Sequence, residues 1–255
     1  MYKNIEIEVS YKYLSKVISK LKEPICILGG WAVFFAVRKN YEKQTGRIYI
    51  GSRDIDIGFN SIEALKQASL VLENKLNFEF VSFRHFKNVH TETGKDLTSD
   101  EAKSLPRHMF FPIYVDMIIS YVNNKVRSKL GFTPIDEPLL KHVFDNKKYR
   151  KGIKEFGKNL LLPTAEVLLA TKLNSVLFRE KEHKRQKDIC DIVALCLFGR
   201  MPISDIIKIS KSFLSKDKIE KFRNISFEKD IINCSNTLGL ELNIARSVID
   251  KIKER

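Results

Sequence analysis

One short apolar stretch carries two acids, and it reads Ile50-Gly51-Ser52-Arg53-Asp54-Ile55-Asp56-Ile57-Gly58-Phe59. Side chains alternate between the faces of a strand, so a strand here places Asp54 and Asp56 on one face and the isoleucines on the other. Asp is disfavoured in strands, and neighbouring carboxylates repel unless a cation lies between them or one is protonated. A hard divalent cation such as Mg²⁺ prefers oxygen ligands. The pattern therefore predicts a metal-binding platform on a strand over residues 48–58.

A glycine pair lies upstream of this stretch. Gly29 and Gly30 follow a short apolar segment over residues 25–28, which we predict to be a strand, and precede a helix predicted over 30–39. Glycine lets the backbone turn tightly and approach a ligand closely. The start of a helix also offers unpaired N–H groups to a phosphate. The pair alone is also typical of an ordinary strand-to-helix turn.

A third acid lies downstream, inside an apolar segment over 110–122 that we predict to be a strand. Asp116 is the only charged residue between Arg107 and Lys125. A buried, isolated carboxylate is costly unless it is paired or binds a metal. Asp116 is therefore predicted to be either a metal ligand or the partner of an arginine.

A glycine pair after a first strand, two alternating aspartates on a second and a third on a later strand resemble the nucleotidyltransferase superfamily, which includes DNA polymerase beta. The resemblance implies transfer of NMP from an NTP to an acceptor hydroxyl, with Mg²⁺ or Mn²⁺ as cofactor. It implies that Asp54, Asp56 and Asp116 are the catalytic metal ligands. It also implies that Gly29 and Gly30 cradle the triphosphate. Ser52, just before the acids, is a further candidate for a phosphate contact.

The C-terminal half adds two cations and an acid. A helix is predicted to begin after Pro163, with Thr164 as its N-cap, and to run to about residue 180. Lys172 and Arg179 lie seven residues apart and so share a face of this helix, among aliphatic side chains. Asp188 follows on a second predicted helix. The alternatives are that the cations extend from the surface, and that Asp188 is their salt-bridge partner.

This order of Lys, Arg and Asp is similar to the AbiEii-like branch of nucleotidyltransferases. The branch is known for toxins of toxin–antitoxin systems, some of which modify tRNA ends. By this resemblance Lys172 contacts the NTP phosphates, Arg179 supports them, and Asp188 orients Lys172 or the metal site. RNA or tRNA is then the expected acceptor, and a cognate antitoxin is a possible partner.

Composition agrees with a polyanionic partner. The 255 residues carry a formal net charge of +14, with a sequence pI of about 9.5. Such an excess favours binding to nucleic acid, although a lysine-rich proteome gives basic surfaces without that function. No apolar run reaches the roughly 20 residues of a membrane span, and the N-terminus has no apolar signal core. We therefore expect a cytoplasmic protein that binds no membrane, with its four cysteines reduced and buried.

The remaining pattern predicts the overall organisation. Helices are expected over 5–22 and 62–76 and a strand over 78–84. The polar segment 89–107 is expected to be a hairpin connection or loop. From residue 138 onward the chain is expected to be helical, with the last strand ending near 126. The prediction is an α+β fold: a nucleotidyltransferase-type mixed sheet flanked by helices, then an all-helical C-terminal region. The domains would be 1–132, catalytic, and 133–255, helical and contributing Lys, Arg and Asp to the site.

Three functions stay open at this point. The first is a nucleotidyltransferase that acts on RNA, of the toxin-like kind. The second is a nucleotidyltransferase that acts on a small molecule or a protein acceptor. The third is a non-catalytic nucleic-acid-binding protein with the same fold.

Overall fold

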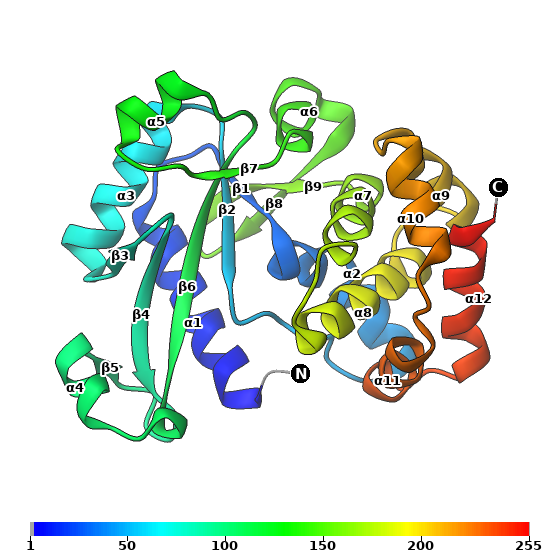
Figure 1. Ribbon diagram of the computed structural model, residues 1–255, viewed down its shortest axis with the longest axis horizontal. Coiled ribbons are helices and arrows are strands. Elements are labelled where there is room, and N and C mark those ends of the chain that lie inside the picture. The colour runs from blue at the N-terminus through cyan, green and yellow to red at the C-terminus, as the bar shows by residue number, and fades with distance from the viewer. Residues whose placement is uncertain (1–2, 255) are drawn as a thin grey trace. The chain divides into compact units, whose positions relative to one another are not determined.

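The computed structural model describes residues 3–254, and they divide into two compact units (Figure 1). The sheet unit comprises the residues up to 31 together with 51–163. The helical unit comprises residues 32–50 together with those from 164 onward. The boundary between the units falls within one helix, α2 (Gly29–Thr45), whose first turn belongs to the sheet unit.

The sheet unit is built on one mixed sheet, in which the described strands follow the order β3-β4-β6-β2-β1-β9-β8. Strands β2 and β6 are parallel, as are β1 and β9, whereas β4 and β6 are antiparallel. Strand β5 pairs with β4, and β7 pairs with β6. The bounds are β1 (Ile25–Ile27), β2 (Ile55–Phe59), β3 (Glu79–Val81), β4 (Arg84–His90), β5 (Asp96–Leu97), β6 (Phe110–Ile119), β7 (Ile135–Asp136), β8 (Arg150–Glu155) and β9 (Lys158–Pro163).

Helix α3 (Ile62–Leu76) covers one face of β2, β4 and β6. Ser61 caps its start by accepting from the Ala64 N–H, and Asn77 ends it in the left-handed conformation. From the sheet, Lys87 Nζ donates to the Leu76 carbonyl at 2.6 Å. The other described helices of this unit are α1 (Asn4–Lys20), α4 (Ser99–Ser104), α5 (Asn124–Leu130) and α6 (Leu139–Asp145), with short 3₁₀ turns η1 (Arg107–Met109) and η2 (Lys147–Tyr149).

The helical unit is arranged around α8 (Glu182–Phe198), whose residues from 187 to 196 are all buried. Residues of α2 join it through two polar contacts: Asn40 Nδ2 donates to the Phe198 carbonyl and the Tyr41 hydroxyl to the Leu238 carbonyl, each at 2.9 Å. The other helices are α7 (Ala165–Val176), α9 (Ile203–Ser212), α10 (Lys216–Asn224), α11 (Glu228–Leu238) and α12 (Leu242–Lys253).

The predicted fold class is confirmed, because a mixed sheet flanked by helices precedes a helical C-terminal region. Helix α3 has the predicted bounds, and all four cysteines are free and buried. None of the helices among residues 3–254 has both the length and the apolarity to cross a bilayer. The division into functional domains at residue 132 stays a prediction, and the compact units divide the chain elsewhere.

Several predicted bounds are wrong. The strand expected over 48–58 begins only at Ile55, because the backbone at Gly51 passes tightly over the Trp31 ring, where a Cβ would lie 2.6 Å from the ring edge. Helix α2 continues beyond the predicted end at residue 39 to Thr45 and stops before Gly46, whose φ is +67°. Helix α7 ends at Val176, so Arg179 follows the helix instead of lying on it.

Strands also continue well beyond residue 126. Strands β8 and β9 form a hairpin closed by Gly157, whose φ of +73° suits a tight turn, and β9 adds to the sheet beside β1. The segment 89–107 is also more ordered than a loop. It holds β5 and α4, and α4 begins with a capping box between Thr98 and Glu101.

Candidate functional site

A row of side chains crosses three neighbouring strands of the sheet. Arg84 on β4 is the register partner of Asp116 on β6, and Asp116 is the register partner of Asp56 on β2. Register partners point to the same face, so the three side chains are neighbours on the face opposite α3. Asp54 precedes β2 at a bend and is buried. Strand pairing thus places Asp56 beside Asp116, and Asp54 lies two residues before Asp56.

The glycine at the start of α2 lies against this row. Gly29 has a φ of +60°, and a Cβ at this position would overlap the Oδ2 atom of Asp56. The backbone remains close because the Leu28 N–H donates to the Asp56 carbonyl at 3.0 Å. Glycine is therefore required at position 29 for two reasons: its left-handed backbone conformation, and the close approach of the Asp56 carboxylate.

Arg84 is the residue that the sequence reasoning missed. Its Nε donates to Asp116 Oδ1 at 2.8 Å and its Nη2 to Asp116 Oδ2 at 2.5 Å. Burial lowers the pKa of Arg84, but the bonds to Asp116 and the negative charges of Asp116, Asp54 and Asp56 outweigh it and raise that pKa. Three aspartates therefore converge on one guanidinium. A second arginine, Arg53, lies with its Nε 3.7 Å from Asp54 Oδ1.

The donor chemistry of this row suits a divalent cation, since carboxylate oxygens are the ligands Mg²⁺ prefers. In the structure, however, the Arg84 guanidinium already supplies positive charge at Asp116, where a divalent cation would bind. Within residues 3–254, no group of three or more His, Cys, Asp or Glu side chains is close enough to hold a metal as it stands. A metal at Asp116 would either share the carboxylate with Arg84 or bind an oxygen that Arg84 releases. Asp56, which is half-buried, and Asp54 would be the neighbouring ligands for such a cation.

We expect Gly29→Ala to lower the free energy of unfolding by roughly 2–5 kcal/mol, from the left-handed backbone and the overlap with Asp56 together. Gly131→Ala is the matched control, because Gly131 has a φ of +78° with nothing within 4 Å of its Cβ position. It should lose only about 1–2 kcal/mol. Urea unfolding of both variants measures the difference. Equal losses would mean that the Asp56 carboxylate moves away without cost.

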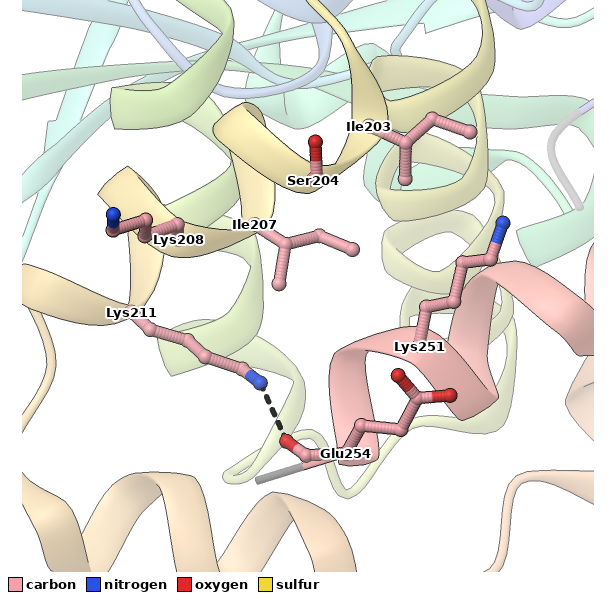
Figure 2. A pocket seen from close by; sticks show the side chains of 7 residues that line it. All are labelled: Ile203, Ser204, Ile207, Lys208, Lys211, Lys251 and Glu254. Atoms are coloured by element: carbon pink, nitrogen blue, oxygen red, sulfur yellow. Dashed lines mark hydrogen bonds between the residues drawn. The ribbon is translucent and has the colours of Figure 1, made fainter.

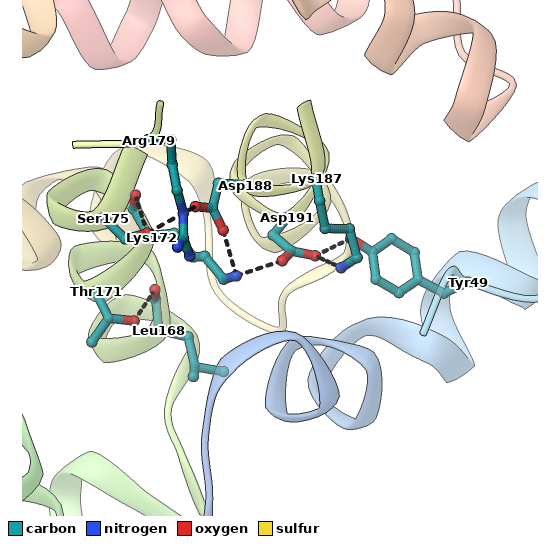
Figure 3. Close-up of polar contacts among 9 residues, drawn as sticks. All are labelled: Tyr49, Leu168, Thr171, Lys172, Ser175, Arg179, Lys187, Asp188 and Asp191. Atoms are coloured by element: carbon teal, nitrogen blue, oxygen red, sulfur yellow. Dashed lines mark hydrogen bonds and ion pairs between the residues drawn. The ribbon is translucent and has the colours of Figure 1, made fainter. Parts of the chain in front are cut away.

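The second group of predicted residues lies in the helical unit, where α7 and α8 meet (Figure 3). Lys172 Nζ lies 2.7 Å from Asp188 Oδ1 and 2.7 Å from Asp191 Oδ2. Arg179 Nε donates to Asp188 Oδ2 at 2.6 Å, and Ser175 Oγ donates to the same oxygen at 3.0 Å. The alternative of a surface-extended Lys172 is excluded, because its exposed fraction is 7%.

Four members of this cluster, Ser175, Lys187, Asp191 and Tyr49, were not assigned a role from sequence. Lys187 pairs with Asp191, and the Tyr49 hydroxyl donates to Asp191 Oδ1 at 2.7 Å (Figure 3). Lys187 also lies 5.4 Å from the centroid of the Tyr49 ring. The only sequence signal was the inward position of Asp191, three residues after Asp188 on α8. Tyr49 comes from the segment after α2, and no local pattern predicts its partner.

Each charged side chain of the cluster has a partner of opposite charge. Burial lowers the pKa of Lys172, but Asp188 and Asp191 outweigh it and raise that pKa above its usual value. Burial raises the pKa of Asp188, but Lys172 and Arg179 outweigh it and lower that pKa. Burial, followed by the charge of Asp191, raises the pKa of Tyr49 well above its usual value. Lys172 and Asp188 are therefore both ionised at neutral pH, and the hydroxyl of Tyr49 remains protonated.

The predicted site residues therefore form two groups. Asp54, Asp56, Asp116, Gly29, Gly30 and Ser52 belong to the sheet unit, and Lys172, Arg179 and Asp188 belong to the helical unit. Ser52 is buried in the irregular segment before β2. Within the helical group, Arg179 is the more accessible cation, with 35% of its side chain exposed.

A cavity of about 740 Å³ lies elsewhere in the helical unit, along α9 and the end of α12 (Figure 2). Three lysines line it, and Lys211 Nζ donates to the Glu254 carbonyl at 2.7 Å. Burial, together with Arg223, lowers the pKa of Lys211. The remaining lining residues are Ile203, Ser204, Ile207, Lys208 and Lys251. The cavity is basic, but it contains none of the predicted site residues.

Comparisons with known proteins add little. No protein-family model matches the chain, and no curated protein matches it. Among solved structures, an antigenic nucleotidyltransferase-like protein from Paracoccidioides brasiliensis aligns over 94% of this chain and 95% of its own. Its sequence identity is 13% and its TM-score is 0.40. A likeness at that level supports no statement about activity.

Proposed function

We propose that this chain is a metal-dependent nucleotidyltransferase that moves NMP from an NTP to an acceptor hydroxyl, with RNA as the acceptor. The observation that carries the proposal is the row Arg84, Asp116 and Asp56 across β4, β6 and β2, with Gly29 against Asp56. Clustered carboxylates on adjacent strands, beside a glycine at a helix start, are what phosphoryl transfer needs for positioning and charge neutralisation.

In this proposal Asp54, Asp56 and Asp116 hold the divalent cation. A cation bound there would offset negative charge on the transferred phosphoryl group. Asp116 would accept the proton of the attacking hydroxyl through a carboxylate oxygen released by Arg84. The hydroxyl oxygen would form the new bond to the α-phosphorus of the NTP as the bond to pyrophosphate breaks, and pyrophosphate would leave. The N–H groups at the start of α2 would meet phosphate oxygens. Arg179, being more exposed than Lys172, is the better candidate for a phosphate contact in the helical unit.

A second candidate is a non-catalytic nucleic-acid-binding protein with the same fold. The bidentate bond from Arg84 favours it, because that bond already neutralises Asp116 without a metal. The net charge of +14 suits nucleic acid in either case.

The two candidates are separated by incubating the purified protein with Mg²⁺ and each of the four α-labelled NTPs, with total RNA present or absent. We expect label in an RNA band for wild type, and none for Asp54→Ala or after EDTA. Label on the protein itself would indicate a protein acceptor. Label in neither, with NTP still bound, would indicate a small-molecule acceptor. Label in neither, with RNA bound but no NTP bound, would support the non-catalytic candidate and overturn the enzyme.

A further inference from the structure

The face of the sheet that carries the acids also carries two pairs of aromatic side chains. Along β4 and β6, the even-numbered residues lie on the face opposite α3. On this face, the pair next to Arg84 and Asp116 is Phe86 with Tyr114. Asn88 with Pro112 follows, and then His90 with Phe110. Each of these four rings is half-buried, whereas the odd-numbered residues between them, from 85 to 89 and from 111 to 115, are buried.

The first aromatic pair is in contact with the candidate site. The Phe86 and Tyr114 ring centroids are 6.5 Å apart, with planes inclined at 44°. The Arg84 guanidinium that holds Asp116 also lies 4.0 Å from the Tyr114 centroid. Residues two apart on a strand are separated by about 6.6–6.8 Å, so the aromatic surface begins one such step from Asp116. An extended ligand bound along this aromatic surface would therefore have one end beside Asp116.

Cations lie at the far end of this surface. The Thr91 N–H donates to the Met109 carbonyl at 2.8 Å, and Thr91 Oγ1 donates to the His108 carbonyl at 3.1 Å. These bonds join the end of β4 to η1, where Arg107 and His108 are exposed. Lys95, also exposed, lies nearby because its carbonyl accepts from the His90 N–H at 2.9 Å.

Aromatic rings on an open sheet face, with cations alongside, are the means by which proteins bind unpaired bases and the phosphates between them. A duplex cannot use such a surface, because its bases are stacked on one another. The chemistry therefore favours single-stranded nucleic acid.

We propose that the aromatic face of β4 and β6, defined by Phe86, Tyr114 and Phe110, binds the single-stranded end of a nucleic-acid acceptor by base stacking. The proposed binding follows from the residues of this face alone and does not depend on catalysis. The further statement, that the bound end delivers its terminal hydroxyl to Asp116, rests on the proposed function.

The test measures binding of a fluorescein-labelled single-stranded oligoribonucleotide of about 12 nucleotides, within the usual size range for such sites, by anisotropy in Mg²⁺-free buffer. We expect Phe86→Ala and Tyr114→Ala each to raise Kd by roughly 5- to 150-fold, and Phe86→Tyr to leave Kd within about twofold. Phe86→Leu retains apolar packing without an aromatic ring and should weaken binding as the alanine does. Tyr121→Ala, at a tyrosine 64% exposed outside the aromatic face, is the control and should bind as wild type.

Wild-type affinity in both alanine variants would overturn the proposal. Equal affinity for the matching duplex would also overturn it. The same holds if Phe86→Leu binds with full affinity and only variants with a lowered melting temperature lose binding. The proposed function fails separately. If Asp56→Asn binds the oligonucleotide but transfers no NMP, both ideas survive. If it still transfers NMP while Phe86→Ala loses binding, the aromatic face stands and the catalytic assignment falls.

Discussion

Asp56→Asn is expected to reduce NMP transfer by roughly 10³-fold or more while the protein still folds. Asn has nearly the shape of Asp but carries no charge, so it keeps the packing beside Gly29 and removes one carboxylate from the row. Repulsion between neighbouring carboxylates decreases as well, which offsets the weaker attraction to Arg84. The measurement is transfer from an α-labelled NTP to RNA, with thermal unfolding recorded on the same sample.

Asp100→Asn is the matched control. Asp100 is an acid of the same unit whose side chain is 93% exposed, so its loss should change transfer by less than about twofold. Transfer in Asp56→Asn at more than a tenth of the wild-type rate would remove Asp56 from the catalytic site. A large loss of transfer together with early unfolding would instead assign Asp56 a structural role beside Gly29.

The elements that sequence predicted well are those whose pattern is local. Helix α3 has an N-cap serine, a periodic apolar face and an Asn in the left-handed conformation at its end, all within one short segment. Asp116 was recognisable because a lone acid within an apolar strand needs a partner. The register that brings Asp116 beside Asp56 is not local, but two strands that both bury their isoleucines have few ways to pair.

The features that sequence missed depend on contacts between distant residues. Arg84 is an ordinary arginine in its own segment, and only the pairing of β4 with β6 places it on Asp116, 32 residues away. Tyr49 reaches Asp191 across 142 residues. The apolar run at 160–163 reads equally well as the approach to a helix or as a buried strand, and only its position beside β1 decides.

In the helical unit, Asp188→Ala is expected to lower the free energy of unfolding by about 3 kcal/mol. The change leaves Lys172 buried with one carboxylate instead of two and removes the ion pair between Asp188 and Arg179. Removing one member of a buried pair costs more than the pair contributes, because the other charge stays desolvated. Urea unfolding gives the value, with Glu228→Ala as the control. Glu228 pairs with Arg246 at the surface, with 55% of its side chain exposed, and should contribute less than about 1 kcal/mol.

The double variant Lys172→Met, Asp188→Leu distinguishes the two roles of this cluster. Apolar side chains of similar volume avoid the desolvation of both charges, so the double variant should recover most of the stability that Asp188→Ala loses. Its effect on transfer is then informative, because instability no longer explains a loss. If Lys172 meets the NTP phosphates, the stable double variant should need roughly tenfold or more NTP to reach half its maximal rate. If transfer is unchanged at every NTP concentration, Lys172 and Asp188 only hold α7 against α8, and Arg179, which this variant retains, is the remaining candidate of the cluster for a phosphate contact.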